Sequence, residues 1–537
     1  MTAPDVPSPA AAAEQNVPSR GPRPRAQAAP GRTLLVALAA GATVGLIAFL
    51  LFPLLPHRTA SGAEFEGDAP LVDDVSAALD PELVQGLAVA RFPNEDADGV
   101  EWVTAGTADG TEPIGQDTLF ETASVFKAFT AMTLADMVEN GETSLDRTLA
   151  DVFPELDFAD PEIADANLEE LATHHAGFVT EAETGLRGPV ATMVSGDMYR
   201  AATPPLEHAT ATMSLNRGSY QYSNAGYAVL GEALAAESGT DYQDLVRERI
   251  LDPLGMDDTY VVDDGVPEGG AGPHAEPGAR VQEWRNTDYV AVGITTWSTA
   301  DDLVRFMAAV ADGSAPGLDS MDPVHDPFDA AIPGQMFDGT GIGLGWHLLD
   351  VSDVGQVTWH SGGTLGSRSM VATDGEHSVV VMSNSFSTDS VNLAFTLLGD
   401  DPEPLAPTFA PWLFLSLTLA MVLLPPLLLF ALVLRRRTLV IQRPLDRLRI
   451  VSLTLGSVAW LLAALRVGGW VDTPPFVWAV GVALVAAALT VAVWHWSRVP
   501  VEAARWRWVR ITLFVPSVLF SLALGSLALW GTLTAWS

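Results

Sequence analysis

The chain has 537 residues, no cysteine and a formal net charge of −38 at pH 7. The lack of cysteine excludes disulfides and thiolate metal sites, and the negative charge argues against nucleic acid as a partner. Five apolar segments are each long enough to cross a bilayer, which predicts an integral membrane protein: residues 33–55, 411–434, 450–470, 476–494 and 511–530.

These segments divide the chain into six parts. A Pro-, Ala- and Arg-rich stretch, 1–32, predicts a disordered cytoplasmic tail, and 33–55 predicts a transmembrane anchor. Residues 56–69 and 401–410 are linkers. Residues 70–400 have ordinary globular composition, and 411–532 predict four transmembrane helices.

Charge is distributed as unevenly as hydrophobicity. Between residues 33 and 405, 61 acidic residues stand against 12 arginines and one lysine, a formal charge of about −48. Most other arginines lie at 20–32, 435–449 and 498–510, with Arg466 the exception. Short basic loops stay on the cytoplasmic side, so this pattern predicts an extracytoplasmic domain in a multi-pass cell-membrane protein. The alternative is a cleaved signal peptide, since the small residues at 59–63 would permit cleavage.

Residues 70–400 show strand patterns at both ends and mainly helical patterns between them. We therefore predict an α+β domain whose sheet is built from both ends. In chain order the pattern indicates a helical segment over 71–89 leading into a strand at 87–92, a strand at 99–104, helices at 124–140, 226–238, 242–250 and 298–312, strands at 343–349, 357–360, 369–373 and 378–383, and a helix at 390–398.

The first chemically informative motif is Ser124-Val-Phe-Lys127, at the start of a predicted helix. Residues at i and i+3 share a helical face, and a serine nucleophile needs a neighbouring base. Lys127 is the only lysine in a chain with 27 arginines, and arginine cannot lose its proton in proteins. The pair therefore predicts a catalytic serine with a lysine base, against the alternative of an accidental helical Ser/Lys pair.

Two weaker motifs follow. Tyr222-Ser-Asn224 combines a phenol that could relay a proton with an amide that could hold a substrate carbonyl. His360-Ser-Gly-Gly363 ends a predicted strand, where glycines let a substrate backbone approach and expose an N–H for an oxyanion. Alone, each is more often an ordinary turn.

In this order, the three motifs resemble the serine β-lactamase and DD-peptidase family, specifically its class C-like, CubicO-type branch. The resemblance extends over about residues 70–395. It rests also on six further stretches: 117–142 (DTLFETASVFKAFTAMTLADMVENGE), 171–178 (LATHHAGF), 222–231 (YSNAGYAVLG), 253–259 (PLGMDDT), 293–306 (GITTWSTADDLVRF) and 341–346 (GIGLGW).

The resemblance implies a two-lobed fold, an antiparallel sheet flanked by helices plus a helical lobe, with the site between them. It implies that Ser124 forms an acyl-enzyme and that Lys127 and Tyr222 share proton transfer. Asn224, His360 and Gly362 would contact substrate. The oxyanion hole would be the backbone N–H groups of Ser124 and Gly363. No metal and no cofactor are implied.

Two histidine positions qualify this picture. His174, in the LATHHAGF stretch, is expected to be a hydrogen-bonded structural residue rather than a catalytic one, and no metal-ligand spacing joins it to other side chains. His360 stands where β-lactamases carry the lysine of Lys-Thr-Gly. A mostly neutral histidine attracts a substrate carboxylate less, which favours an esterase, amidase or peptidase over a strong β-lactamase. Arg368 could restore positive charge.

The sequence thus predicts a membrane-anchored extracytoplasmic serine hydrolase that acts on an ester or amide, with a cell-wall or D-amino peptide as one candidate. One alternative is a sensor that is acylated by a penicillin or peptide and signals through its transmembrane helices. Another is an inactive structural relative, against which the intact motifs argue. The sequence does not predict an oligomeric state.

Overall fold

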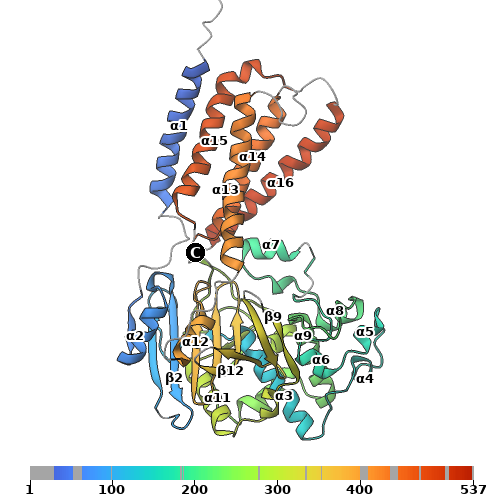
Figure 1. Cartoon of the computed structure of the whole chain (residues 1–537). Helices are drawn as coiled ribbons and strands as arrows, with labels where there is room; N and C mark the ends of the chain where they lie inside the picture. The colour runs from blue at the N-terminus through green and yellow to red at the C-terminus, as the bar shows by residue number, and fades with distance from the viewer. Residues whose placement is uncertain are drawn as a thin grey trace, which may run out of the picture.

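The structure is a computed structural model of the whole chain (Figure 1). The proposed tail and both linkers lie wholly or partly outside the described residues. The structure describes residues 30–52, 63–97, 99–181, 184–185, 187–275, 279–332, 335–351, 354–399, 409–435, 445–470, 473–501 and 507–534.

Five helices are long and apolar enough to cross a membrane. In Figure 1 they stand together on one side of the globular domain, and α1 packs against α15, α13 against α14 and α15, and α14 against α16. Each agrees with a predicted segment to within several residues. They are α1 (Pro30–Leu51), α13 (Phe409–Arg435), α14 (Arg447–Val467), α15 (Phe476–His495) and α16 (Arg507–Thr534).

The globular domain is built on a nine-stranded antiparallel sheet in the order β1-β3-β2-β14-β13-β12-β11-β10-β9. β2 pairs with β14, so strands from both ends of the domain meet at its centre, as predicted. The strands are β1 (Phe65–Gly67), β2 (Gly86–Pro93), β3 (Glu101–Gly106), β9 (His325–Ile332), β10 (Gln335–Ile342), β11 (His347–Val351), β12 (Gly355–Gly363), β13 (Arg368–Thr373) and β14 (His377–Ser383).

Both faces of this sheet are covered. Side chains alternate along β14: Val379 and Val381 pack toward α2 (Ala69–Ala78) and α12 (Ser390–Leu398), whereas Val380 and Met382 face the main core with α3 (Phe126–Glu139) and α11 (Ala300–Asp312). Strands buried on both faces carry near-continuous apolar runs, as Val379–Met382 does.

A helical lobe lies beside the sheet, visible in green and teal in Figure 1. The two-lobed α+β fold implied by the resemblance is confirmed. The lobe's helices are α4 (Leu149–Val152), α5 (Pro161–Ala164), α6 (Leu168–Ala172), α7 (Arg187–Val194), α8 (Pro205–Ala211), α9 (Asn224–Ser238) and α10 (Tyr242–Val246), with short turns η4 (Tyr199–Ala201) and η5 (Arg247–Leu251).

Several predicted boundaries were wrong. The helical segment expected over 71–89 ends at Ala78, because Leu79 is already extended and Pro81 follows. The strand expected at 343–349 begins only at His347, since Gly345 has a φ of +76°. The β9–β10 hairpin was not predicted.

Candidate active site

Ser124 lies in a short turn, η3 (Ala123–Val125), between β4 (Phe120–Glu121) and helix α3. Ala123 has a φ of +47°, which is unfavourable for a residue with a Cβ. The turn is fixed from two sides: Thr122 N donates to Thr296 O at 3.0 Å, and Ser369 Oγ donates to Thr122 O at 2.5 Å. A strained, well-supported turn of this kind is common at functional sites.

Lys127 lies one helical turn further on and points back at Ser124. Its Nζ is 2.9 Å from Ser124 Oγ and 3.2 Å from the carbonyl of Val292, and the residue is 0% exposed. Nζ also lies 5.0 Å from the centre of the Tyr222 ring. Burial lowers the pKa of Lys127 to about 7, while the charge of Glu181 acts in the opposite direction. Near neutral pH a substantial fraction of this amine is therefore unprotonated.

Tyr222 lies beside Lys127, the residue that contacts Ser124. It precedes helix α9 and is 4% exposed, and its ring centre lies 5.0 Å from Lys127 Nζ. Burial raises the pKa of Tyr222 well above its usual value, and the nearby Ser124 side chain only partly offsets this rise. The phenol is therefore neutral and can pass a proton on without storing charge.

Asn224 is the first residue of α9 and is held by a cluster that sequence reasoning missed. Its Nδ2 donates to Glu181 Oε2 at 3.0 Å and to the Tyr199 hydroxyl at 2.8 Å. Tyr199 donates in turn to Glu181 Oε2 at 2.7 Å. Asn224 Oδ1 is buried and has no hydrogen-bond partner among the described residues. That oxygen is the part of the side chain left to accept from a ligand.

β12 brings Gly362 against the turn that contains Ser124. A Cβ on Gly362 would lie 2.5 Å from Thr122 O and 2.9 Å from Ser124 N, so only glycine permits this approach. Gly363, the next residue, is exposed, and Ser124 is partly exposed. The strand end therefore places accessible backbone beside the serine, as an oxyanion site requires.

His360, on the same strand, is 1% exposed. Its Nδ1 donates to the carbonyl of Ser361 at 2.8 Å, and its Nε2 has no partner among the described residues. His347, which was not predicted as a site residue, lies beside it with ring centres 5.4 Å apart. Burial lowers the pKa of His360 well below its usual value and that of His347 to about 3. Both rings are thus neutral, and His360 does not supply the positive charge of a lysine.

His174 has structural contacts. Its φ is +63°, its Nδ1 accepts from the backbone N–H of Ser223 at 3.1 Å, and its carbonyl accepts from Gln221 N at 2.8 Å. Its ring lies 4.4 Å from that of Tyr222. His174 therefore holds the loop that presents Tyr222 and Asn224.

Arg368 lies opposite Gly363 in the sheet. Its guanidinium donates to the carbonyls of Thr364 and Ser367 at 2.8 and 2.9 Å and covers the ring of Phe386 at 4.0 Å. These contacts fix the side chain near the end of β12. The charge of Arg368 is therefore engaged with backbone carbonyls and an aromatic ring beside the end of β12.

A buried carboxylate supports the same region from behind. Glu121 accepts hydrogen bonds from Ser367 Oγ at 2.6 Å, from Thr364 Oγ1 at 3.0 Å and from the backbone N–H of Trp284 at 3.0 Å. Burial raises the pKa of Glu121 to about 7, and these hydrogen bonds act against the rise. These bonds join β4, which precedes the Ser124 turn, to the loop after β12.

Comparison with known proteins agrees with this geometry. Residues 84–400, more than half of the chain, match the family model described as Beta-lactamase. The chain is 28% identical over 295 residues to a penicillin-binding protein 4 of Amycolatopsis lactamdurans, covering 50% of this chain and 72% of that protein. It is 25% identical over 319 residues to a beta-lactamase of Escherichia coli (strain K12), covering 54% and 74%.

A further relative is named as an unguisins hydrolase of Aspergillus campestris (strain IBT 28561), 26% identical over 377 residues, covering 63% of this chain and 66% of that protein. Among solved structures, one class C beta-lactamase superposes with a TM-score of 0.50 at 18% identity, covering 62% of this chain and 96% of the other. That likeness shows the fold. The chain belongs to the beta-lactamase family of serine hydrolases.

Proposed function

We propose that this protein is a membrane-anchored hydrolase that cleaves an ester or amide through an acyl-enzyme on Ser124. One observation is decisive for the proposal: the Nζ of the chain's single lysine lies 2.9 Å from Ser124 Oγ. Because burial lowers the pKa of this amine to about 7, it can act as a base at working pH.

In the proposed reaction, neutral Lys127 takes the proton of Ser124 while Oγ attacks the substrate carbonyl carbon. The carbonyl oxygen becomes an oxyanion, held by the backbone N–H groups of Ser124 and Gly363. As the tetrahedral intermediate collapses, the bond to the leaving alcohol or amine breaks, and that group receives the proton through Tyr222. Water then attacks the acyl-enzyme, releases the acid and restores Ser124. Asn224 and the β12 strand, with His360 and Gly362, position the substrate.

The charge around β12 indicates the substrate class. His360 is buried and neutral, and a lost charge-assisted hydrogen bond to a carboxylate is typically worth about 1.5–3 kcal/mol. We therefore propose substrates whose recognition does not depend on a carboxylate beside the scissile bond. Relatives named as a penicillin-binding protein, a beta-lactamase and a hydrolase of unguisins keep D-amino peptides among the candidates.

Turnover separates this proposal from its main alternative. We expect the purified full-length protein to hydrolyse a neutral chromogenic ester through many cycles, with a kcat/KM about tenfold or more above that for a chromogenic cephalosporin. Both are measured by absorbance under the same conditions. A single stoichiometric burst with every substrate would instead favour an acylation sensor. In such a sensor, the contact of α7 with α14 and α16 would connect the domain to the membrane helices.

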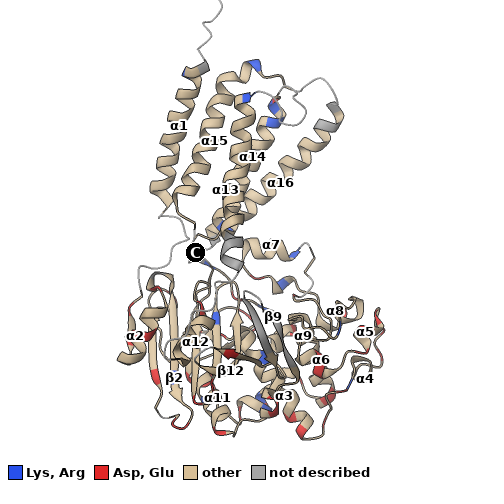
Figure 2. Cartoon of the chain, in the orientation of Figure 1, with Lys and Arg blue, Asp and Glu red and all other residues tan. Residues whose placement is uncertain are grey.

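We also propose that α1 stays attached and that the catalytic domain is extracytoplasmic. Gly41 and Gly45 of α1 approach α15 so closely that added Cβ atoms would lie 2.7 and 2.8 Å from atoms of Ala483, and such small residues typify packed membrane helices. Figure 2 shows acidic residues over the globular domain and basic residues at the helix ends far from it, as the positive-inside rule requires.

Protease added to intact spheroplasts tests this orientation. We expect digestion of the domain from its exposed loops, while an epitope inserted next to Arg435 in the basic loop is spared until the membrane is broken. Protection of the domain together with cleavage at the epitope would reverse the proposed topology.

A further inference from the structure

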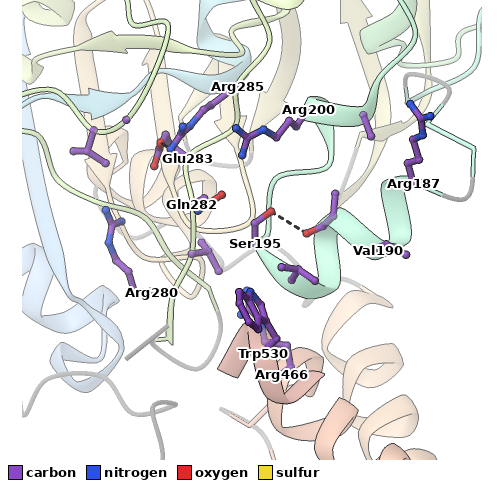
Figure 3. A pocket seen from close by; sticks show the side chains of 16 residues that line it. Arg187, Val190, Ser195, Arg200, Arg280, Gln282, Glu283, Arg285, Arg466 and Trp530 are labelled. Atoms are coloured by element: carbon purple, nitrogen blue, oxygen red, sulfur yellow. Dashed lines mark hydrogen bonds and ion pairs between the residues drawn. The ribbon is translucent and has the colours of Figure 1, made fainter. Parts of the chain in front are cut away.

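A cavity of about 860 Å³ lies where the globular domain meets the membrane helices (Figure 3), and Ser124 is not among the residues that line it. Helix α7 and the segment 280–285 line it from the domain, and Arg466 and Trp530 line it from α14 and α16. The two parts touch here: Arg466 Nε donates to the carbonyl of Met193 at 3.2 Å. The cavity is therefore lined by both parts of the protein.

Its charge is the opposite of the domain's. Four of the twelve arginines between residues 33 and 405 line this cavity, and the fifth lining arginine comes from α14. Glu283 is the one acidic residue among those that line it. In a region of about −48 overall, such a concentration of cations is a local reversal. The five are Arg187, Arg200, Arg280, Arg285 and Arg466.

Acidic neighbours neutralise only part of this charge. Arg285 pairs with Asp264 and Glu283, but its Nε has no hydrogen-bond partner among the described residues. Burial, and next the like charge of Arg200, lower the pKa of Arg285, with Asp197 opposing them. Arg200 therefore lies close enough to repel Arg285. Glu283 also attracts Arg280 and Arg200, so this one lining carboxylate is shared among three guanidinium groups. A bound anion would add to their neutralisation.

Arg466 gives independent support. It is the single arginine of the C-terminal part that lies outside the basic loops, and it is 7% exposed at the last turn of a membrane helix. A buried charge at such a position is costly and is usually retained for function. Its one hydrogen bond to a described residue is to a backbone carbonyl, which leaves most of its donors available.

The shape and the apolar lining indicate the ligand. Guanidinium groups bind phosphate oxygens in pairs of hydrogen bonds, but 860 Å³ is far more than one phosphate fills. Val190, Val194 and Val281 line the same cavity, and the exposed indole of Trp530 lies at its membrane side. Basic pockets beside membrane helices suit lipid headgroups. We propose that this cavity binds the phosphate headgroup of an anionic membrane lipid in the leaflet that faces the domain.

The test uses the full-length protein in detergent with defined lipids added, and native mass spectrometry as the readout. We expect retention of phosphatidylglycerol over phosphatidylcholine at equal concentration. The double variant Arg200→Gln/Arg466→Gln should weaken phosphatidylglycerol binding at least tenfold. Arg247→Gln, which removes an exposed arginine of η5 outside the cavity, should leave binding unchanged. Arg200→Lys/Arg466→Lys, which keeps both charges, should retain more binding than the Gln pair.

Equal lipid retention by the wild type and the Gln double variant would overturn the proposal. Glycerol phosphate provides the second arm: binding as tight as that of the lipid would show a site for soluble phosphate and would overturn the lipid assignment. Folding is checked by the melting temperature and by labelling of Ser124 with a fluorophosphonate. A Gln variant that loses lipid while labelling normally supports a lipid site that is separate from the hydrolase site.

Discussion

Replacing Ser124 with alanine is expected to abolish covalent labelling by a fluorophosphonate and by any ester that acylates the protein. The hydroxyl lies 2.9 Å from the amine of Lys127, and among the described residues it is the one hydroxyl to which this amine is hydrogen-bonded. The loss should reach the background rate, because removing the nucleophile of a covalent mechanism removes the whole pathway. Labelling is followed by gel fluorescence and by mass spectrometry of the modified peptide.

Ser361→Ala is the matched control. Ser361 is a partly exposed serine on β12, so it is the neighbouring hydroxyl that a promiscuous probe could reach. Labelling should survive this change, and both variants should melt near the wild-type temperature, since neither removes a large buried side chain. Labelling that disappears in Ser361→Ala and persists in Ser124→Ala would assign the nucleophile to the strand and end the present proposal.

Sequence alone could place the site residues that lie close together in the chain. Ser124 and Lys127 are separated by one helical turn, so a motif of four residues already fixes their proximity. Gly362 was predicted as a site residue because glycines at a strand end permit close backbone approach. The structure places it against Thr122 and Ser124. The geometry of the Ser124–Lys127 pair follows from neighbours in the chain, whereas the approach of Gly362 to Ser124 was expected only from the family resemblance.

Glu181 and Tyr199 could not be found that way. They reach Asn224 from segments with no motif, 43 and 25 residues away in the chain, and only the folded helical lobe joins them. The missed β9–β10 hairpin has a similar cause. Its two segments, HDPFDAAI and QMFDGTGI, contain Pro, Asp and Gly, which are depleted in strands. Tertiary pairing overrides the weak local preference there.

Lys127→Arg is expected to lower the rate of Ser124 acylation by about 10²–10⁴, the range typical of lost general-base help. Arginine keeps the positive charge, the length and the helix propensity of lysine, so a purely structural cation would tolerate the change. A base would not, because arginine cannot lose its proton at working pH. The measurement is single-turnover acylation by a chromogenic ester, with the melting temperature recorded for each variant.

The pH dependence gives the same prediction an internal check. Since burial holds the pKa of Lys127 near 7, the amine is protonated and inactive below that pH and free to accept a proton above it. Wild-type acylation should therefore rise from pH 6 to pH 8 and then level off. Burial also raises the pKa of Glu121 to about 7, so Glu121→Gln is the control variant. The rise in acylation rate between pH 6 and pH 8 should remain in that variant.

A second variant distinguishes loss of the base from loss of folding stability, because Lys127 is buried. Lys127 is 0% exposed beside Tyr222 and Tyr227, so a permanently charged arginine costs desolvation that a half-neutral lysine largely avoids. Lys127→Met has similar length and no charge, and it should keep the wild-type melting temperature while losing acylation to the same extent. If Lys127→Arg or Lys127→Met retained more than a tenth of the wild-type rate, Lys127 would not be the base, and the proton of Ser124 would have to leave by another route.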